Sequence, residues 1–213
     1  MQRFLIVTAL ASVWGQAPAP ELAPRGIPVK ASALDYEFHG DAGKIGIGAL
    51  YMGRSFAAAP HDSEDKQRTV LFDAGSFLVV ELAAFASKGF TGEVHIGDFA
   101  LRIDGQKSAL AAAGPGIVRN TLRTQSAAAQ PHRTQGFPGD PQPQQRRPPG
   151  AEPAQENPQH EWDAALESSF PEGKLQSSRA GNLFFFFPGK TAKLKSMTLE
   201  YNGEGGKLEI KLR

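Results

Sequence analysis

The chain has 213 residues, no cysteine and a formal net charge of +1 at neutral pH. The balanced charge argues against nucleic acid as a partner and against an anionic membrane surface, because both select strongly basic faces. Without cysteine there is no disulfide framework and no lipid-acceptor cysteine behind a leader peptide. We therefore expect one hydrophobic core to stabilise the fold, with no membrane insertion after a leader is removed.

The first residues of the chain resemble a secretory signal peptide. Arg3 precedes a short apolar run, Phe4–Val13, and the small residue Gly15 follows that run. The run is too short for a membrane-spanning helix, which needs roughly 20 apolar residues. We predict a signal peptide over 1–15, an Ala/Pro-rich spacer over 16–32, and a secreted or periplasmic location.

The first part of the domain, residues 33–123, carries a series of β-strand patterns. Apolar residues alternate with polar or small ones, which is typical of strands with one face in a core. The predicted strands are Ala33–His39, Lys44–Phe56, Thr69–Phe72, Ser76–Phe85, Asp98–Ile103 and Gly116–Leu122. Ser76–Phe85 is apolar at nearly every position, so we expect both of its faces to be buried. Asp104-Gly105 predicts a tight turn.

The composition changes over residues 124–160. Thr124–His160 contains no Ile, Leu, Val or Met and is rich in Pro and Gln. Such a segment cannot bury enough apolar surface to offset the entropy of ordering, so we predict a long disordered Pro/Gln-rich insert. A domain tolerates such an insert because the entropy of closing a loop grows slowly with its length. Order is expected to resume at residue 161, with one or two helical turns over Asp163–Ser169.

The C-terminal part, residues 161–213, ends in the clearest pattern of the chain. Apolar and polar residues alternate over Met197–Tyr201 and again over Leu208–Leu212. The turn-like segment Asn202–Gly206 lies between these two stretches. This predicts an antiparallel hairpin with one face in the core, and it indicates an all-β fold.

Four segments of the chain, taken in order, carry a family resemblance. They are the apolar strand Phe77–Ala84, the strand and turn Gly97–Leu110, the polar-to-aromatic segment Ser168–Lys190 and the strand Leu194–Asn202. Together they resemble the uncharacterised bacterial immunoglobulin-like domains of exported proteins and lipoproteins, which are related to a secreted mycobacterial antigen. The resemblance implies an immunoglobulin-like antiparallel β-sandwich at or outside the cell envelope. It implies no activity and no catalytic residues.

The aromatic side chains of Phe184, Phe185, Phe186, Phe187 and Trp162 are the candidate interaction residues. Successive strand residues point to opposite faces, so the four phenylalanines place two rings on each side of a sheet. Either both faces are covered in a central strand, or one pair of rings lies at a partner surface. An exposed Trp162 would favour carbohydrate binding, since its ring could stack on a sugar.

No motif for catalysis, metal binding or cofactor binding stands out. The five histidines show no metal-ligand spacing, the acidic loop His61–Asp65 lacks a calcium-loop pattern, and no nucleophile motif is present. The glycines of Gly43–Gly48 alternate with isoleucine as in a strand. We expect no cofactor and no enzymatic activity.

The expected function is that of a non-enzymatic extracytoplasmic binding or envelope-associated module. Its expected partner is an envelope or extracellular protein. A carbohydrate-binding sandwich is the alternative, and a small secreted hydrolase or metal-dependent enzyme is the next.

Expression of the full chain in a secretion-competent host should yield exported protein that begins near Gln16. Signal peptidases cut after small residues that follow a short apolar run, and Gly15 fits that position. N-terminal sequencing of the exported protein measures the start. Leu5→Arg, which interrupts the apolar run, should block export, and an exported product that begins at Met1 would contradict the prediction.

Overall fold

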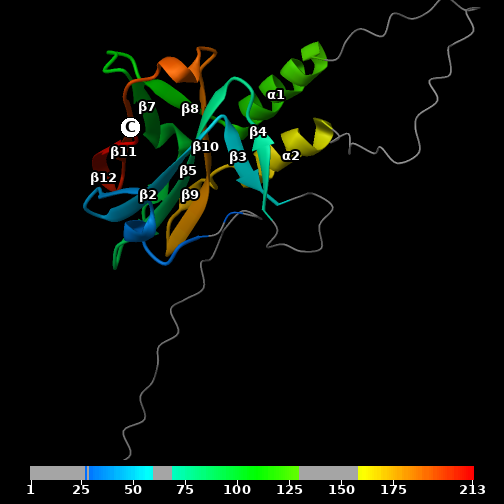
Figure 1. Ribbon diagram of the computed structural model, residues 1–213. Helices are drawn as coiled ribbons and strands as arrows, with labels where there is room; N and C mark the ends of the chain where they lie inside the picture. Colours follow the sequence, from blue (N-terminus) through cyan, green and yellow to red (C-terminus); the bar gives the residue numbers. More distant parts are fainter. Residues whose placement is uncertain (1–26, 28, 60–68, 130–157) are drawn as a thin grey trace, which may run out of the picture.

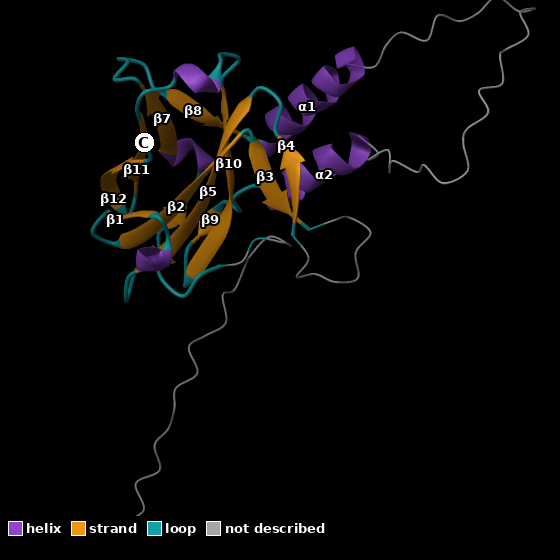
Figure 2. Cartoon of the chain, viewed as in Figure 1, coloured by secondary structure: helices purple, strands orange, loops and turns teal. Residues whose placement is uncertain are grey.

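A computed structural model of the protein describes residues 27, 29–59, 69–129 and 158–213. The predicted signal peptide, most of the spacer, the acidic loop His61–Asp65 and the middle of the insert lie outside these residues. The described chain forms an eight-stranded antiparallel sheet, two two-stranded sheets and two α-helices (Figures 1 and 2).

The large sheet has the strand order β1-β2-β5-β10-β8-β7-β11-β12. Its strands are β1 (Phe38–Asp41), β2 (Ile45–Gly53), β5 (Phe77–Ala86), β7 (Phe99–Ile103), β8 (Leu110–Ala113), β10 (Ser178–Phe186), β11 (Met197–Gly203) and β12 (Gly206–Lys211). The small sheets pair β3 (Ser55–Ala58) with β4 (Val70–Asp73) and β6 (Glu93–Val94) with β9 (Gly173–Lys174). The helices are α1 (Pro115–Ala129) and α2 (Pro158–Ser168), and 3₁₀ turns occur at Ala33–Asp35, Ile96–Asp98 and Thr191–Lys193.

The large sheet curls until its first and last strands come close together. The backbone N–H of Lys44, in the turn after β1, donates to the carbonyl oxygen of Gly205, in the turn before β12, at 3.1 Å. Gly206 permits this approach, because its φ is +128° and a Cβ there would lie 1.9 Å from the carbonyl oxygen of Ala42. The two halves of the sheet therefore face each other across a single inner core.

The inner core takes side chains from both halves of the sheet. Its largest fully buried members are Ile45, Ile47, Leu78, Leu82, Phe99, Leu101, Phe170, Leu175 and Phe185. The predicted hairpin is confirmed as β11 and β12, with Leu199 opposite Ile210 and with both side chains buried in this core. The Asp104-Gly105 turn is also confirmed, since both residues have positive φ.

A second core covers the outer face of β5 and β10. Phe77 of β5 and Phe184 of β10 point to this side, and Phe56 of β3 packs edge-on against Phe184 with ring centroids 5.4 Å apart. Helices α1 and α2 close the layer through Val118 and Ala165, both fully buried. Figure 1 shows both helices and the β3–β4 hairpin together on one side of the molecule. The prediction that Ser76–Phe85 is buried on both faces is confirmed.

The chain is rich in β-structure, as predicted, but the immunoglobulin-like sandwich is not confirmed. A sandwich has two separate sheets packed face to face. Here β8 pairs with β10 on one side and with β7 on the other, so both halves belong to one continuous sheet. The helical turns predicted over Asp163–Ser169 are confirmed in part as the end of α2, which begins earlier, at Pro158, and α1 was not predicted.

The predicted strand Gly116–Leu122 is wrong, because these residues belong to α1. Pro115 occupies the first helical position, where its fixed φ suits a helix. Val118 and Leu122 are spaced four apart and both are buried, which is the spacing of one helix face. The helix continues to Ala129 and α2 begins at Pro158, so the predicted insert boundaries at 124 and 160 are both too wide.

The predicted strand Ala33–His39 is confirmed only at its end, where β1 begins at Phe38. Before it, the Asp35 carboxylate accepts a hydrogen bond from the backbone N–H of Ser32 at 2.9 Å and closes a 3₁₀ turn. Such local side-chain bonds compete with strand pairing. Leu34 is consequently 74% exposed instead of facing a core.

Leu199→Ala should lower the free energy of unfolding by about 2–5 kcal/mol, because it leaves a cavity where β7, β11 and β12 meet. Denaturant unfolding monitored by circular dichroism measures the change. Glu209→Ala on the exposed side of β12 is the control and should stay within about 0.5 kcal/mol. Equal losses in the two variants would show that the register is wrong.

Gly181→Ala should destabilise the fold by roughly 1–3 kcal/mol or more through overpacking. A Cβ at Gly181 would lie 2.3 Å from the Cα of Phe170, so the backbone at Phe170 would have to move. Gly97→Ala is the matched control, since a Cβ there meets nothing within 4 Å. Thermal melts compare the two, and a melt of Gly181→Ala that matches the Gly97→Ala melt would refute the close packing at Phe170.

Candidate functional site

The four phenylalanines of the predicted aromatic site are divided among different environments. Phe184 and Phe185 are buried, in the outer and inner cores respectively. Phe187 is half-buried against the inner core, and Phe186 is 49% exposed with its ring against Phe77. The central-strand interpretation therefore describes Phe184 and Phe185, and Phe186 is the most exposed of the four rings. A binding role for Phe186 stays a prediction.

Trp162 is a half-buried part of the outer layer. Its ring packs against the outer core, and its Nε1–H lies 3.5 Å from the hydroxyl oxygen of Ser126 on α1. Arg119 and Asp163 form a second contact between the two helices at 3.3 Å. These contacts join α1 to α2, so the ring of Trp162 is not the open sugar platform that would favour carbohydrate binding.

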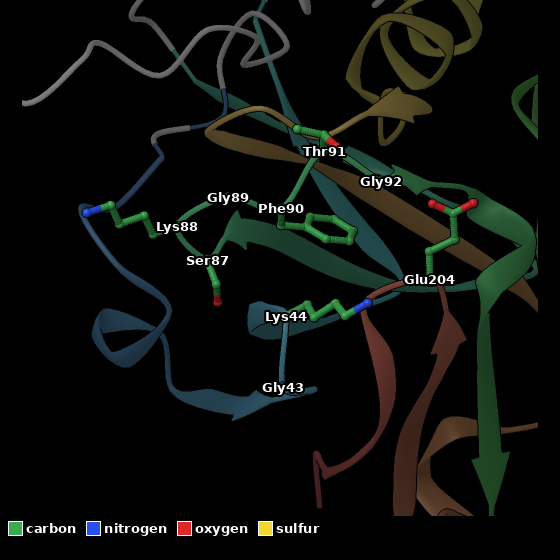
Figure 3. Close-up of a pocket in the computed structure, with 9 residues that line it drawn as sticks. All are labelled: Gly43, Lys44, Ser87, Lys88, Gly89, Phe90, Thr91, Gly92 and Glu204. Carbon is green, nitrogen blue, oxygen red and sulfur yellow. The ribbon is translucent and has the colours of Figure 1, made fainter.

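An open pocket of about 680 Å³ lies where three turns of the chain meet (Figure 3). The turn after β1 contributes Gly43 and Lys44, the loop between β5 and β6 contributes Ser87–Gly92, and the turn between β11 and β12 contributes Glu204. These turns are distant in sequence. The curl of the sheet brings them together, because it places the β1–β2 turn beside the β11–β12 turn.

Backbone and side-chain hydrogen bonds hold the loop between β5 and β6 against the other two turns. The N–H of Ser87 donates to the carbonyl oxygen of Lys44 at 2.9 Å. On the other side, the N–H of Glu93 donates to Oε2 of Glu204 at 2.9 Å. The loop turns at Gly89, whose φ of +83° is one that L side chains rarely adopt. The lining of the pocket is thus fixed at both ends of the loop.

The pocket combines one aromatic ring with two opposite charges. Phe90 is half-buried against the inner core, and Figure 3 shows its ring directed into the pocket. The Lys44 ammonium reaches in beneath this ring, Glu204 stands on the far side, and Lys88 points away. A ligand in the pocket would meet an apolar surface, a cation and a hydrogen-bond acceptor. The arrangement suits recognition of a polar ligand with a ring or an apolar face.

These pocket residues were not among the candidate site residues predicted from the sequence. The segment that lines most of the pocket is Ser87–Gly92, in which an aromatic residue stands in a loop between Gly89 and Gly92. This aromatic residue in a loop between glycines is the local signal that could have indicated a functional loop. The contributions of Lys44 and Glu204 depend on how the sheet closes, and no local pattern carries that information.

Within the ranges that the structure describes, no group of three His, Asp or Glu side chains lies close enough to hold a metal ion. Neither α-helix in the described part of the chain is long and apolar enough to cross a membrane.

No protein-family model matches the sequence, and no curated protein matches it significantly. Among solved structures, the chain is similar to a "putative lipoprotein (ycdA)" from Bacillus subtilis, with 11% sequence identity and a TM-score of 0.38. The match covers 83% of this chain and 38% of that protein, so the chain spans well under half of its length.

Proposed function

We propose that the protein is an exported, non-enzymatic binding module that takes a polar ligand in the pocket around Phe90. The observation that carries the proposal is the convergence of three separate turns on one pocket, each supplying a different chemical group. Loops positioned by a rigid sheet are common places for binding sites. The hydrogen bonds at Lys44 and Glu204 hold this site in shape before any ligand arrives.

The charges at the pocket define what a ligand must offer. Lys44 presents a cation that attracts a carboxylate, phosphate or sugar hydroxyl oxygen. Glu204 uses one carboxylate oxygen on the backbone of Glu93, which leaves the other to accept a hydrogen bond from a ligand. Phe90 offers one face for an apolar surface or a ring. The proposed ligand is a segment of an envelope or extracellular molecule that offers an oxygen atom to Lys44, a hydrogen-bond donor to Glu204 and an apolar face to Phe90.

The location and the family also belong to this proposal. The apolar run of Phe4–Val13 and the small residues after it support a secreted or periplasmic protein. The resemblance to immunoglobulin-like domains of exported proteins is supported by the Asp-Gly turn after β7 and by the alternating strand β11.

Carbohydrate is the second candidate ligand, and its proposed site is the pocket around Phe90 instead of the ring of Trp162. The half-buried Trp162 does not offer an open platform, whereas Phe90 has a ring with polar groups on either side. Sugar sites combine such a ring with charged or amide side chains that bond to hydroxyl groups. An oligosaccharide would therefore compete with a peptide for the same pocket.

A titration of the ¹⁵N-labelled full chain tests the pocket. The probes are N-acetylated amino-sugar oligosaccharides and short peptides with a free carboxylate, followed by heteronuclear NMR. We expect saturable shifts at residues 43–44, 87–92 and 204 with one of these probes. Lys44→Ala should weaken that binding by about tenfold, because a charge-assisted hydrogen bond contributes roughly 1.5–3 kcal/mol.

Lys107→Ala is the matched control, since this exposed lysine lies in the loop between β7 and β8 and does not line the pocket. Its affinity should stay within about twofold of the wild type, as expected for a change outside the contact. Saturable shifts that centre on Phe186 would move the site to the aromatic strand. A titration without saturable shifts for any probe would refute the pocket as a binding site for these ligand classes.

A further inference from the structure

The outer face of the large sheet holds a buried carboxyl group far from the pocket. Glu81 lies in the middle of β5 and is 6% exposed. On the same face it is preceded by Val79 and followed by Ala83. Its cross-strand neighbours are Leu50 on β2 and Asn182 on β10. A carboxyl group in such surroundings needs a partner, because burial of an unpaired charge is costly.

Asn182 offers one half of such a partnership. Its side chain is 1% exposed, and its Nδ2–H donates to the carbonyl oxygen of Ala57 at 3.0 Å. Its Oδ1 has no hydrogen-bond partner among the residues that the structure describes. A buried acceptor of this kind calls for a donor. A protonated Glu81 carboxyl carries an O–H donor, whereas an ionised carboxylate can only accept, so the two side chains are complementary only when Glu81 is protonated.

Residues 27 and 29–36, which we call the N-terminal strap, cover the sheet next to Glu81. Ile27 and Tyr36 of the strap are buried against Ala83 and Ala180. The Tyr36 ring lies so close to the sheet that a Cβ on Gly48 would come within 2.3 Å of it. On the other side of Glu81 the cover is β3, through Ala57. Glu81 therefore lies at a seam between two separate covers.

The charged and titratable groups of the strap are Lys30, Asp35 and Tyr36. Lys30 has its ammonium 4.8 Å from the centre of the Tyr36 ring, and its backbone N–H donates to the Tyr36 hydroxyl oxygen at 3.3 Å. Asp35, the acidic residue of the strap, lies beside Tyr36 and accepts hydrogen bonds from Ser32. The neighbours on β2, β3 and β10 are a leucine, an alanine and an asparagine, none of which titrates. Among the described residues, the exposed Lys30 is the cation that attracts an ionised Glu81.

We propose that Glu81 and Asn182 form a pH-dependent hydrogen bond. While Glu81 is protonated, this bond keeps the N-terminal strap packed on the sheet, and when Glu81 ionises the strap detaches. Ionisation removes the donor for Asn182 and places a charge under Tyr36. The charge gains solvation when the strap lifts and water enters the seam. The lifted strap uncovers an apolar strip of the sheet at Ala83, Phe85 and Ala180.

The direction of the pH dependence follows from the surroundings of the carboxyl group. Burial raises the pKa of Glu81 above its ordinary value, and attraction by Lys30 opposes this in part. A group whose pKa is raised in the folded state stabilises that state while it is protonated, and this contribution is lost as the pH rises through the raised pKa. The strap should therefore be seated at low pH and should loosen as the pH increases.

The three tyrosines of the chain provide the test. Full-length protein labelled with ¹³C at the tyrosine ring ε-carbons gives signals for Tyr36, Tyr51 and Tyr201, assigned with single Tyr→Phe variants. Between about pH 4 and pH 8, which spans the range of raised carboxyl pKa values, we expect the Tyr36 signal to titrate with one midpoint above 4.5. Tyr201, buried in the inner core, is the internal control and should stay unchanged.

Two variants decide whether Glu81 is the group that titrates. In Glu81→Gln, a neutral side chain of the same shape that can donate to Asn182, the Tyr36 signal should keep its low-pH position throughout. In Lys30→Met, which changes an exposed side chain, the midpoint should move to higher pH because the attracting charge is lost. A pH-independent Tyr36 signal in the wild type would overturn the proposal. So would an unchanged titration in Glu81→Gln, or, if that variant does not fold, an unchanged midpoint in Lys30→Met.

Discussion

The antiparallel ladder between β5 and β10 is the interaction on which the rest of the structure depends. It pairs nine residues of each strand, from Ser178 opposite Phe85 to Phe186 opposite Phe77. Because both strands are central, their inward side chains form the floor of the inner core and their outward side chains form the floor of the outer core. Each large apolar side chain buried this way contributes roughly 1.5–3 kcal/mol. The N-terminal strap and the layer of β3, β4 and the two helices both pack on the outer face of this pair. The remaining strands of the curled sheet extend from it on either side.

The local parts of the fold were predictable because local patterns determine them. Met197–Tyr201 and Leu208–Leu212 alternate cleanly, and a one-residue slip would turn every apolar side chain to solvent. The sequence of β5 is apolar at nearly every position, and this local pattern indicated that both of its faces are buried. The prediction of a strand over Gly116–Leu122 failed because so short an apolar pattern fits a strand or a helix equally well. The spacing of Val118 and Leu122 indicates a helix only once a second helix is known to pack beside it. The insert boundaries failed with it, since α1 and α2 stabilise each other.

The features that depend on distant residues were not predictable. Whether two β-layers are separate sheets or one sheet depends on whether β8 joins them, and that strand contributes only two paired residues on each side. The pocket depends on the approach of Gly206 to Ala42, which no pattern in either segment reveals. Of the five candidate site residues, Phe184 and Phe185 serve the cores. Their alternation was visible in the sequence, but the covers that bury them on both sides were not.

The β5–β10 ladder also has a consequence for how the chain reaches its folded state. β5 is complete at Ala86, yet its partner begins at Ser178, so the chain must be extended through β6–β9 and both helices before the two can pair. Contacts between such distant segments slow folding, because a long loop must close before the contacts stabilise it. Until then a strand with two apolar faces has no neighbour on its β10 side, and unpaired strand edges promote association between chains. A chain built in this way gains from being kept unfolded until β10 is available to pair with β5.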